Sequence, residues 1–304
     1  MNIIITGGTG FIGKVLVARL QKEQHRIVVL TRNPEAARTS IGNIVEFVQW
    51  DGKTVGAWAQ HVDGADAVIN LAGESIGARR WSERQKQRII ESRLIATKAV
   101  VTAISQAKKK PSVLINASAV GYYGNVESGD VTESHPKGSG FLADLAERWE
   151  AEARAAETHG ARVVLLRFGV ILEKDGGALQ RMLIPFKLFA GGWLGSGRQW
   201  FPWIHRDDVV EAILFALKNQ SLSGPVNVSA PEAVMMKEFC LALGKAMHRP
   251  CWAPVPSFVL KTALGEMASM LLDGQRMVPK KLLDAGYSFR YSELADALKA
   301  IVNR

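Results

Sequence analysis

The chain has 304 residues, 47% of them hydrophobic and 22% charged, which is typical of a globular protein with a substantial core. Its two cysteines exclude a disulfide framework or a metal site built on cysteine, and they fit a reducing, cytoplasmic setting. The net charge of +9 comes without the aromatic and basic stripe of a nucleic-acid-binding protein, so we expect no nucleic-acid partner. No segment has the roughly 20 apolar residues of a membrane helix, so we expect no membrane partner.

Short apolar runs alternate with helix-like segments over the first 170 residues. Continuous Val, Ile and Leu runs are typical of parallel strands that are covered on both faces. This alternation predicts an α/β fold with a doubly wound parallel sheet. The expected strands are residues 2–6, 26–31, 44–50, 66–72, 112–118 and 162–168, and the expected helices are residues 11–23, 82–108 and 142–159.

The pattern changes after residue 170, where the stretch GGWLGSGRQWFPWIH indicates loops and short strands. A predicted helix at 206–218 and a predicted strand at 225–229 should return the chain to the sheet, and the rest is mostly helical. The predicted division is therefore a sheet domain of residues 1–170 and 204–229, and a smaller helix-rich lobe of residues 171–203 and 230–304.

The stretch TGGTGFIG at residues 6–13 joins the first strand to the first helix. Gly7 permits a tight turn, Gly10 lets the backbone approach a pyrophosphate, and Gly13 lets helix and strand pack closely. The spacing predicts a dinucleotide-binding loop, and the alternative is a strand-to-helix turn without a ligand. The candidate cofactor-binding residues of the loop are Gly7, Thr9, Gly10, Phe11, Ile12 and Gly13.

The second strand ends in Thr31 and Arg32, where a NAD site would have an Asp or Glu for the ribose hydroxyls. A carboxylate would repel a 2′-phosphate, whereas an arginine binds one with two charge-assisted hydrogen bonds. The pair predicts NADP(H) rather than NAD(H), with a solvated loop arginine as the alternative for Arg32.

These features together resemble the short-chain dehydrogenase/reductase superfamily in its extended, epimerase-like form, which implies a two-lobed Rossmann fold. A narrower resemblance, to an atypical branch known as epimerase family proteins with an uncharacterised C-terminal domain, covers nearly the whole chain. The motifs that carry it are NLAGESIGARRW (70–81), ESR (91–93), DGGAL (175–179), GSGRQWFPWIH (195–205) and GQRMVPKKL (274–282).

The resemblance also implies further contacts to the cofactor. Arg88 and Arg93 lie on the long helix at 82–108 and should lean toward the cofactor, unless they lie on a solvated helix face. The implied cofactor contacts are Leu71, Ala72, Gly73, Arg88, Arg93 and Ile171.

Reductases of this superfamily use a Tyr-x-x-x-Lys pair to pass a proton as the hydride moves. The matching stretch at 138–150 has Phe141 and no tyrosine, and Asp144 and Leu145 stand where a lysine would. The remaining hydroxyl groups nearby become the candidate proton donors, although the tyrosines could equally be core or loop aromatics. These candidate catalytic residues are Ser118, Tyr122 and Tyr123.

A candidate substrate pocket comes from Arg198, Trp203 and His205, because aromatic walls with a few polar groups suit a ligand. His205 could instead be a structural hydrogen-bonding partner of Asp208. The sequence favours an NADP(H)-dependent oxidoreductase for an unknown small carbonyl or hydroxyl substrate. A sugar-nucleotide epimerase or dehydratase and a non-catalytic NADP-binding regulator stay open, as does a homodimeric assembly.

Overall fold

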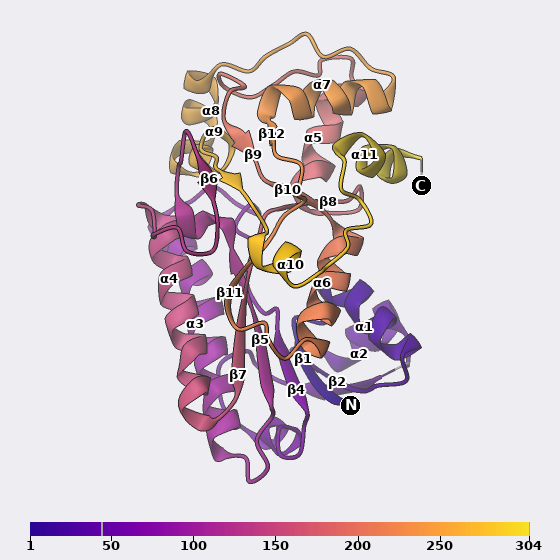
Figure 1. Cartoon of the computed structure of the whole chain (residues 1–304), viewed down its shortest axis with the longest axis vertical. Helices are drawn as coiled ribbons and strands as arrows, with labels where there is room; N and C mark the ends of the chain where they lie inside the picture. Colours follow the sequence, from indigo (N-terminus) through magenta and orange to yellow (C-terminus); the bar gives the residue numbers. More distant parts are fainter. Residues whose placement is uncertain (44, 304) are drawn as a thin grey trace.

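The computed structural model describes residues 1–43 and 45–303, and within these its centre is a seven-stranded parallel sheet (Figure 1). The strand order β11-β7-β5-β4-β1-β2-β3 turns in opposite directions on the two sides of β1, which confirms the predicted doubly wound fold. The first residue of the predicted strand at 44–50 lies outside the described residues. The strands are β1 (Asn2–Thr6), β2 (Arg26–Thr31), β3 (Glu46–Gln49), β4 (Ala67–Asn70), β5 (Val113–Ala119), β7 (Arg162–Phe168) and β11 (Gly224–Val228).

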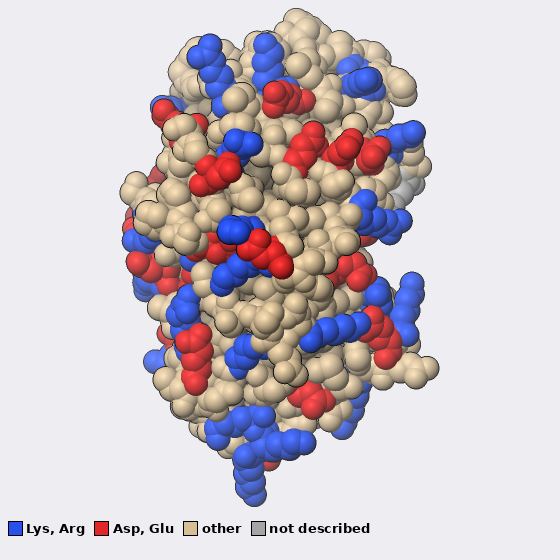
Figure 2. Space-filling model, in the orientation of Figure 1, with Lys and Arg blue, Asp and Glu red and all other residues tan. Residues whose placement is uncertain are grey.

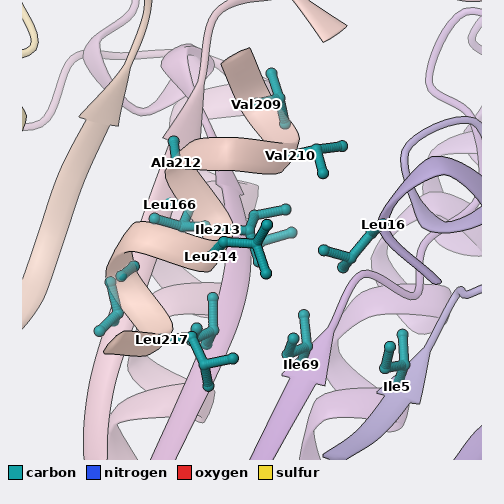
Figure 3. Packing of buried hydrophobic residues seen from close by; sticks show 14 of the residues in the cluster. Ile5, Leu16, Ile69, Leu166, Val209, Val210, Ala212, Ile213, Leu214 and Leu217 are labelled. Atoms are coloured by element: carbon teal, nitrogen blue, oxygen red, sulfur yellow. The ribbon is translucent and has the colours of Figure 1, made fainter. Parts of the chain in front are cut away.

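Helices cover both faces of this sheet, as continuous apolar strands require. Alternate residues of β1 face opposite sides, so that Ile5 packs in the cluster of α1 (Gly13–Lys22) and α6 (Arg206–Lys218), while Ile4 packs toward α3 (Glu83–Gln106). Figure 3 shows the first cluster, in which Leu16 of α1 lies near Ile5 and Ile69, and Ile213 of α6 lies on the side of Leu166. The helix α4 (Phe141–Arg154) packs beside α3, and α2 (Pro34–Ile41) connects β2 to β3.

The C-terminal lobe lies beyond the carboxyl ends of the strands, at the top of Figure 1. Its core joins α5 (Gly177–Lys187), α7 (Met236–Met247) and α11 (Leu294–Val302) through buried side chains such as Leu183, Phe239 and Leu298. Two short strand pairs support it: β8 (Val170–Leu172) with β10 (Trp203–His205), and β9 (Trp200–Phe201) with β12 (Val234–Met235). Two further helices, α8 (Ser257–Leu264) and α9 (Ser269–Leu272), complete the lobe.

The chain returns from the lobe to the sheet more than once. After α6 and β11 have rejoined it, β13 (Arg276–Met277) pairs with β6 (Asp130–Val131), and α10 (Lys280–Asp284) packs against β11. Glu133 links β11 to α10, because one of its carboxylate oxygens accepts the N–H groups of Asn227 and Lys281, each at 3.1 Å. Leu282 and Tyr287 lie in the core of the sheet domain, so this part of the predicted lobe packs with the sheet.

Candidate functional site

The loop between β1 and α1 leaves no room for side chains at two of its glycines. A Cβ atom on Gly13 would lie 2.2 Å from the carbonyl oxygen of Gly7. Gly7 has a φ of +68°, and a Cβ there would lie 2.5 Å from the carbonyl oxygen of Leu71. Gly10 is exposed, and a Cβ there would meet little beyond the Gly7 carbonyl oxygen at 3.2 Å. Gly7 and Gly13 therefore fix the loop, whereas Gly10 leaves its backbone accessible.

A chain of buried hydrogen bonds holds the start of the glycine loop in place. The Thr6 hydroxyl donates to Asn70 Oδ1 at 2.5 Å and accepts the Ala72 N–H at 3.2 Å. Asn70 Nδ2 in turn donates to Asn116 Oδ1 at 2.6 Å and to Thr97 Oγ1 at 2.9 Å. The asparagine of the NLAG segment thus ties the ends of β1, β4 and β5 together, a role that its sequence position alone did not reveal.

The end of β2 presents a cation without a competing anion. Arg32 is exposed, and no carboxylate among residues 1–43 and 45–303 forms an ion pair with it. The nearest carboxylate along the chain, Glu35, pairs with Arg38, and the Asn33 side chain caps α2 by accepting the Ala36 N–H at 3.0 Å. Thr31 is half-buried beside Arg32. Arg32 is therefore available to an anion from outside the chain.

A second cation, Arg93 on α3, packs against the segment that follows β4. Its Cζ lies 3.1 Å from the position of a Cβ on Gly73, and it donates to the carbonyl oxygens of Glu74 at 3.0 Å and Ile89 at 3.2 Å. Burial lowers the pKa of this guanidinium to about 10, although the Glu74 carboxylate favours its charge. Arg88 is exposed, with its Nε 3.8 Å from a Glu74 oxygen. Both arginines thus point toward residues 73–74, but Arg93 lies closer.

The glycine loop touches the C-terminal lobe through Phe11. A Cβ on Gly176 would lie 2.6 Å from the Phe11 ring, and the Arg206 guanidinium lies 5.1 Å from the ring centroid. Arg206 is itself held by Glu173 at 3.1 Å and by Asp175 at 2.6 Å. Predicted contacts Thr9, Ile12 and Ile171 are half-buried around this junction, Ile171 within β8.

The two positions where the superfamily's lysine was expected carry an aspartate and a leucine. Leu145 is 5% exposed and packs in one cluster with Trp81 and Ile89. Asp144 points to Lys137 instead, with 2.7 Å between the two charged groups. This part of α4 therefore offers a cofactor ribose no ammonium group.

A buried polar network occupies the end of β5, where a catalytic serine and tyrosine were predicted. Arg167 donates to the two oxygens of Glu150 at 2.7 and 2.8 Å, and the Ser118 hydroxyl donates to the same carboxylate at 2.6 Å. The Tyr123 hydroxyl accepts from Arg167 at 2.9 Å and donates to Asn227 Oδ1 at 2.6 Å. All five residues are at most 4% exposed. Ser118 and Tyr123 are therefore parts of the interior.

The charges of this network stabilise one another. Burial works against the charge of Arg167, but hydrogen bonds and attraction from Glu150 outweigh it and raise the pKa of the guanidinium above its ordinary value. Burial raises the pKa of Tyr123 to about 12, although the nearby Arg167 opposes this. Tyr123 is consequently held as a neutral phenol at any physiological pH.

Tyr122 differs from the other two predicted donors. Its ring lies over Arg167, with 3.5 Å between the ring centroid and Cζ, and the side chain is half-buried. Within the described part of the chain, its hydroxyl makes no hydrogen bond. Tyr122 is thus held by its ring while its hydroxyl stays available.

The three residues predicted for a substrate pocket lie in different environments. Trp203 is 1% exposed, and its indole N–H donates to the Glu232 carbonyl oxygen at 3.1 Å. His205 is fully buried, and its Nδ1 accepts the Asp207 N–H at 3.0 Å, which caps α6. Arg198 is exposed. The suggested partner Asp208 accepts two other N–H groups, those of Arg290 and Tyr291, at 2.7 and 3.0 Å.

A parallel sheet with a glycine loop after its first strand, and a second lobe beyond the carboxyl ends of the strands, defines a Rossmann-type dinucleotide-binding protein. The sequence profile of the NAD dependent epimerase/dehydratase family matches residues 3–229, and that of a domain of unknown function, DUF1731, matches residues 255–301. The chain belongs to the NAD dependent epimerase/dehydratase family.

Several relatives match along almost the whole chain. It is 44% identical to the chloroplastic epimerase family protein SDR39U1 homolog of Arabidopsis thaliana, over 99% of this chain and 87% of that protein. It is 43% identical to the epimerase family protein YfhF of Bacillus subtilis, over 99% and 98% of the two chains. The crystal structure of human SDR39U1 with NADPH superposes with a TM-score of 0.89, at 34% identity and full coverage of both chains. UDP-glucuronic acid 4-epimerase of Bacillus cereus, at 19% identity and a TM-score of 0.78, shares the fold.

Proposed function

We propose that this protein is an NADP(H)-dependent oxidoreductase that acts on a small carbonyl or hydroxyl compound. The observation that carries the proposal is Arg32, an exposed arginine at the end of β2 with no carboxylate partner among the described residues. A dinucleotide site with a cation and no acid at this position favours the 2′-phosphate of NADP(H). The NADPH present in the crystal structure of human SDR39U1 supports the same cofactor.

The residues around the loop fit such a cofactor. The accessible backbone at Gly10 and the N-terminus of α1 would receive the pyrophosphate, and Arg32 would hold the 2′-phosphate. Arg93 would place a second positive charge beside Gly73, where it donates to the carbonyl oxygens of Glu74 and Ile89. When bound, the nicotinamide would supply or accept the hydride.

Tyr122 is the residue we propose as the proton donor to the substrate, since its hydroxyl is not used within the described residues. The Arg167 guanidinium packs against the face of the Tyr122 ring and holds it in one orientation. Glu150 in turn fixes Arg167 with two hydrogen bonds. Ser118 and Tyr123 then act as positioning residues, because both bond to that ion pair.

The cofactor proposal is tested by titrating NADPH and NADH into the wild type, Arg32→Ala and the control Arg38→Ala. Arg38 is also an exposed arginine, but Glu35 holds it. We expect the wild type to prefer NADPH, and Arg32→Ala to weaken NADPH binding by roughly tenfold to a hundredfold while NADH binding is unchanged. Equal affinity of the wild type for both cofactors would overturn the proposal.

A second function is favoured by the buried state of Ser118 and Tyr123 and by the leucine at position 145. A family member that keeps the cofactor but has lost the lysine could act as an NADP(H)-binding regulator. A panel of carbonyl compounds with NADPH distinguishes the two functions. Turnover that is lost in Tyr122→Phe supports the oxidoreductase, whereas tight NADPH binding without any turnover supports the regulator.

A further inference from the structure

The end of the C-terminal lobe farthest from the sheet exposes several large apolar side chains. Leu188 is 72% exposed, Trp252 67%, Phe189 56% and Ile184 55%. They form one surface, because the Trp252 indole N–H donates to the Phe189 carbonyl oxygen at 2.9 Å and Leu188 follows Ile184 by one helical turn. We call these four residues the apical patch. Contiguous exposed apolar groups of this kind mark interaction surfaces.

Phe189 holds a bulky side chain in the left-handed conformation that caps the C-terminus of α5. It has a φ of +60° and follows the cap residue Leu188, and the N–H groups of Phe189 and Ala190 donate to the carbonyl oxygens of Phe186 and Pro185 at 3.0 and 2.9 Å. Glycine is the usual residue at this position. A bulky side chain is rare in this left-handed conformation and costs about 1 kcal/mol or more. His248 ends α7 in the same conformation, with a φ of +53°. The conformation caps the helix, and glycine would adopt it with less strain, so the exposed aromatic ring of Phe189 has a use other than capping.

The two chain segments that supply the patch carry basic residues and no acidic ones. No Asp or Glu occurs in residues 176–206 or in residues 239–265, the two segments that supply the patch. Lys187, Lys245 and Arg249 lie in these segments, and none of the three forms an ion pair with a carboxylate of the described chain. The Arg249 guanidinium lies 4.4 Å from the centroid of the Phe189 ring, so a cation borders the patch directly. At the uppermost end of the molecule in Figure 2, tan and blue atoms predominate.

We propose that the apical patch docks on the surface of an anionic lipid bilayer. Exposed Trp, Phe and Leu beside Lys and Arg, without acids, match the chemistry of an apolar layer covered by negative headgroups. A second copy of this chain fits less well, because the same positive groups would face each other across the contact. Attachment would be peripheral, since no helix among residues 1–43 and 45–303 has the length and apolar character to span a bilayer. The sequence predicted no membrane partner, and binding to vesicles decides between that prediction and this proposal.

The proposal is tested by flotation of the full chain with phosphatidylcholine vesicles that contain or lack phosphatidylglycerol. We expect binding to the anionic vesicles that weakens with salt, and about fivefold less binding for each of Lys187→Glu and Arg249→Glu. The double variant Leu188→Gln/Trp252→Gln should bind roughly tenfold less or weaker. The matched controls Leu283→Gln and Lys98→Glu, exposed residues on α10 and α3, should bind like the wild type.

The melting temperature of each variant is measured as well, because substitutions in a patch that only stabilises the lobe would lower the melting temperature. Phe189→Gly should lower vesicle binding while its melting temperature does not fall, because glycine relieves the left-handed strain at this position. Equal binding to both kinds of vesicle, no binding at all, or patch variants that bind like the wild type would each overturn the proposal. Sedimentation that shows a dimer dispersed by the patch variants would identify a second copy as the occupant instead.

Discussion

Removing the carboxylate of Glu150 should destabilise the protein more than removing any exposed acid. In Glu150→Ala, the Arg167 guanidinium loses two hydrogen bonds of 2.7 and 2.8 Å and stays buried at 2% exposure without its counter-ion. The Ser118 hydroxyl loses its acceptor in the same step. Breaking a buried ion pair by removing one partner costs about 3 to 5 kcal/mol, because the other charge is left uncompensated.

The assay is urea unfolding followed by circular dichroism, together with a thermal scan, in which this loss corresponds to roughly 5 to 8 °C for a chain of 304 residues. The control is Glu147→Ala on the same helix, whose carboxylate is 54% exposed and pairs with Lys137 at 2.9 Å. That exposed pair should contribute no more than about 1 kcal/mol. The double variant Glu150→Leu/Arg167→Met should recover part of the loss, because neither charge then remains buried. If Glu150→Ala and Glu147→Ala lose the same stability, or the double variant is worse than Glu150→Ala, the reasoning is refuted.

Three further outcomes follow from the site. Gly13→Ala should destabilise the protein by about 1 to 3 kcal/mol or more, since the new Cβ would meet the Gly7 carbonyl oxygen. The control Gly56→Ala, whose Cβ would lie 3.9 Å from its nearest neighbour, should be near neutral in the same urea titration. Arg93→Met should weaken NADPH binding by roughly tenfold in a fluorescence titration, and an unchanged affinity would remove Arg93 from the site. Stability should fall between pH about 10, where an unfolded phenol titrates, and pH about 12, where Tyr123 titrates in the fold. Chemical denaturation across that range should show a shallower fall in Tyr123→Phe.

The strands and the glycine loop could be predicted because each depends on neighbours in the sequence. Apolar runs place β1, β2 and β7 at the expected residues, since a strand covered on both faces needs apolar residues throughout. The roles of Gly7 and Gly13 also follow from local spacing, and their close contacts agree with it.

The buried network at the end of β5 could not be predicted in this way. Its members Ser118, Tyr123, Glu150, Arg167 and Asn227 come from five separate segments and share no spacing. Ser118 and Tyr123 were predicted as candidate proton donors, and no role was predicted for the other three residues. The burial of all five depends on mutual hydrogen bonds that tertiary structure alone provides. The burial of Trp203 was not predicted for the same reason, whereas a structural role for His205 was one of the two alternatives.

The late return of the chain to β11 has a consequence for synthesis on the ribosome. β11 is an edge strand. Glu133, which precedes it in the chain, bonds the Asn227 N–H, but α10, which packs against β11, lies much later in the sequence. Until α10 has left the exit tunnel, the nascent sheet has an incompletely covered border that can pair with other chains. A chain that stopped after β11 would contain every strand of the sheet and would still be prone to aggregate.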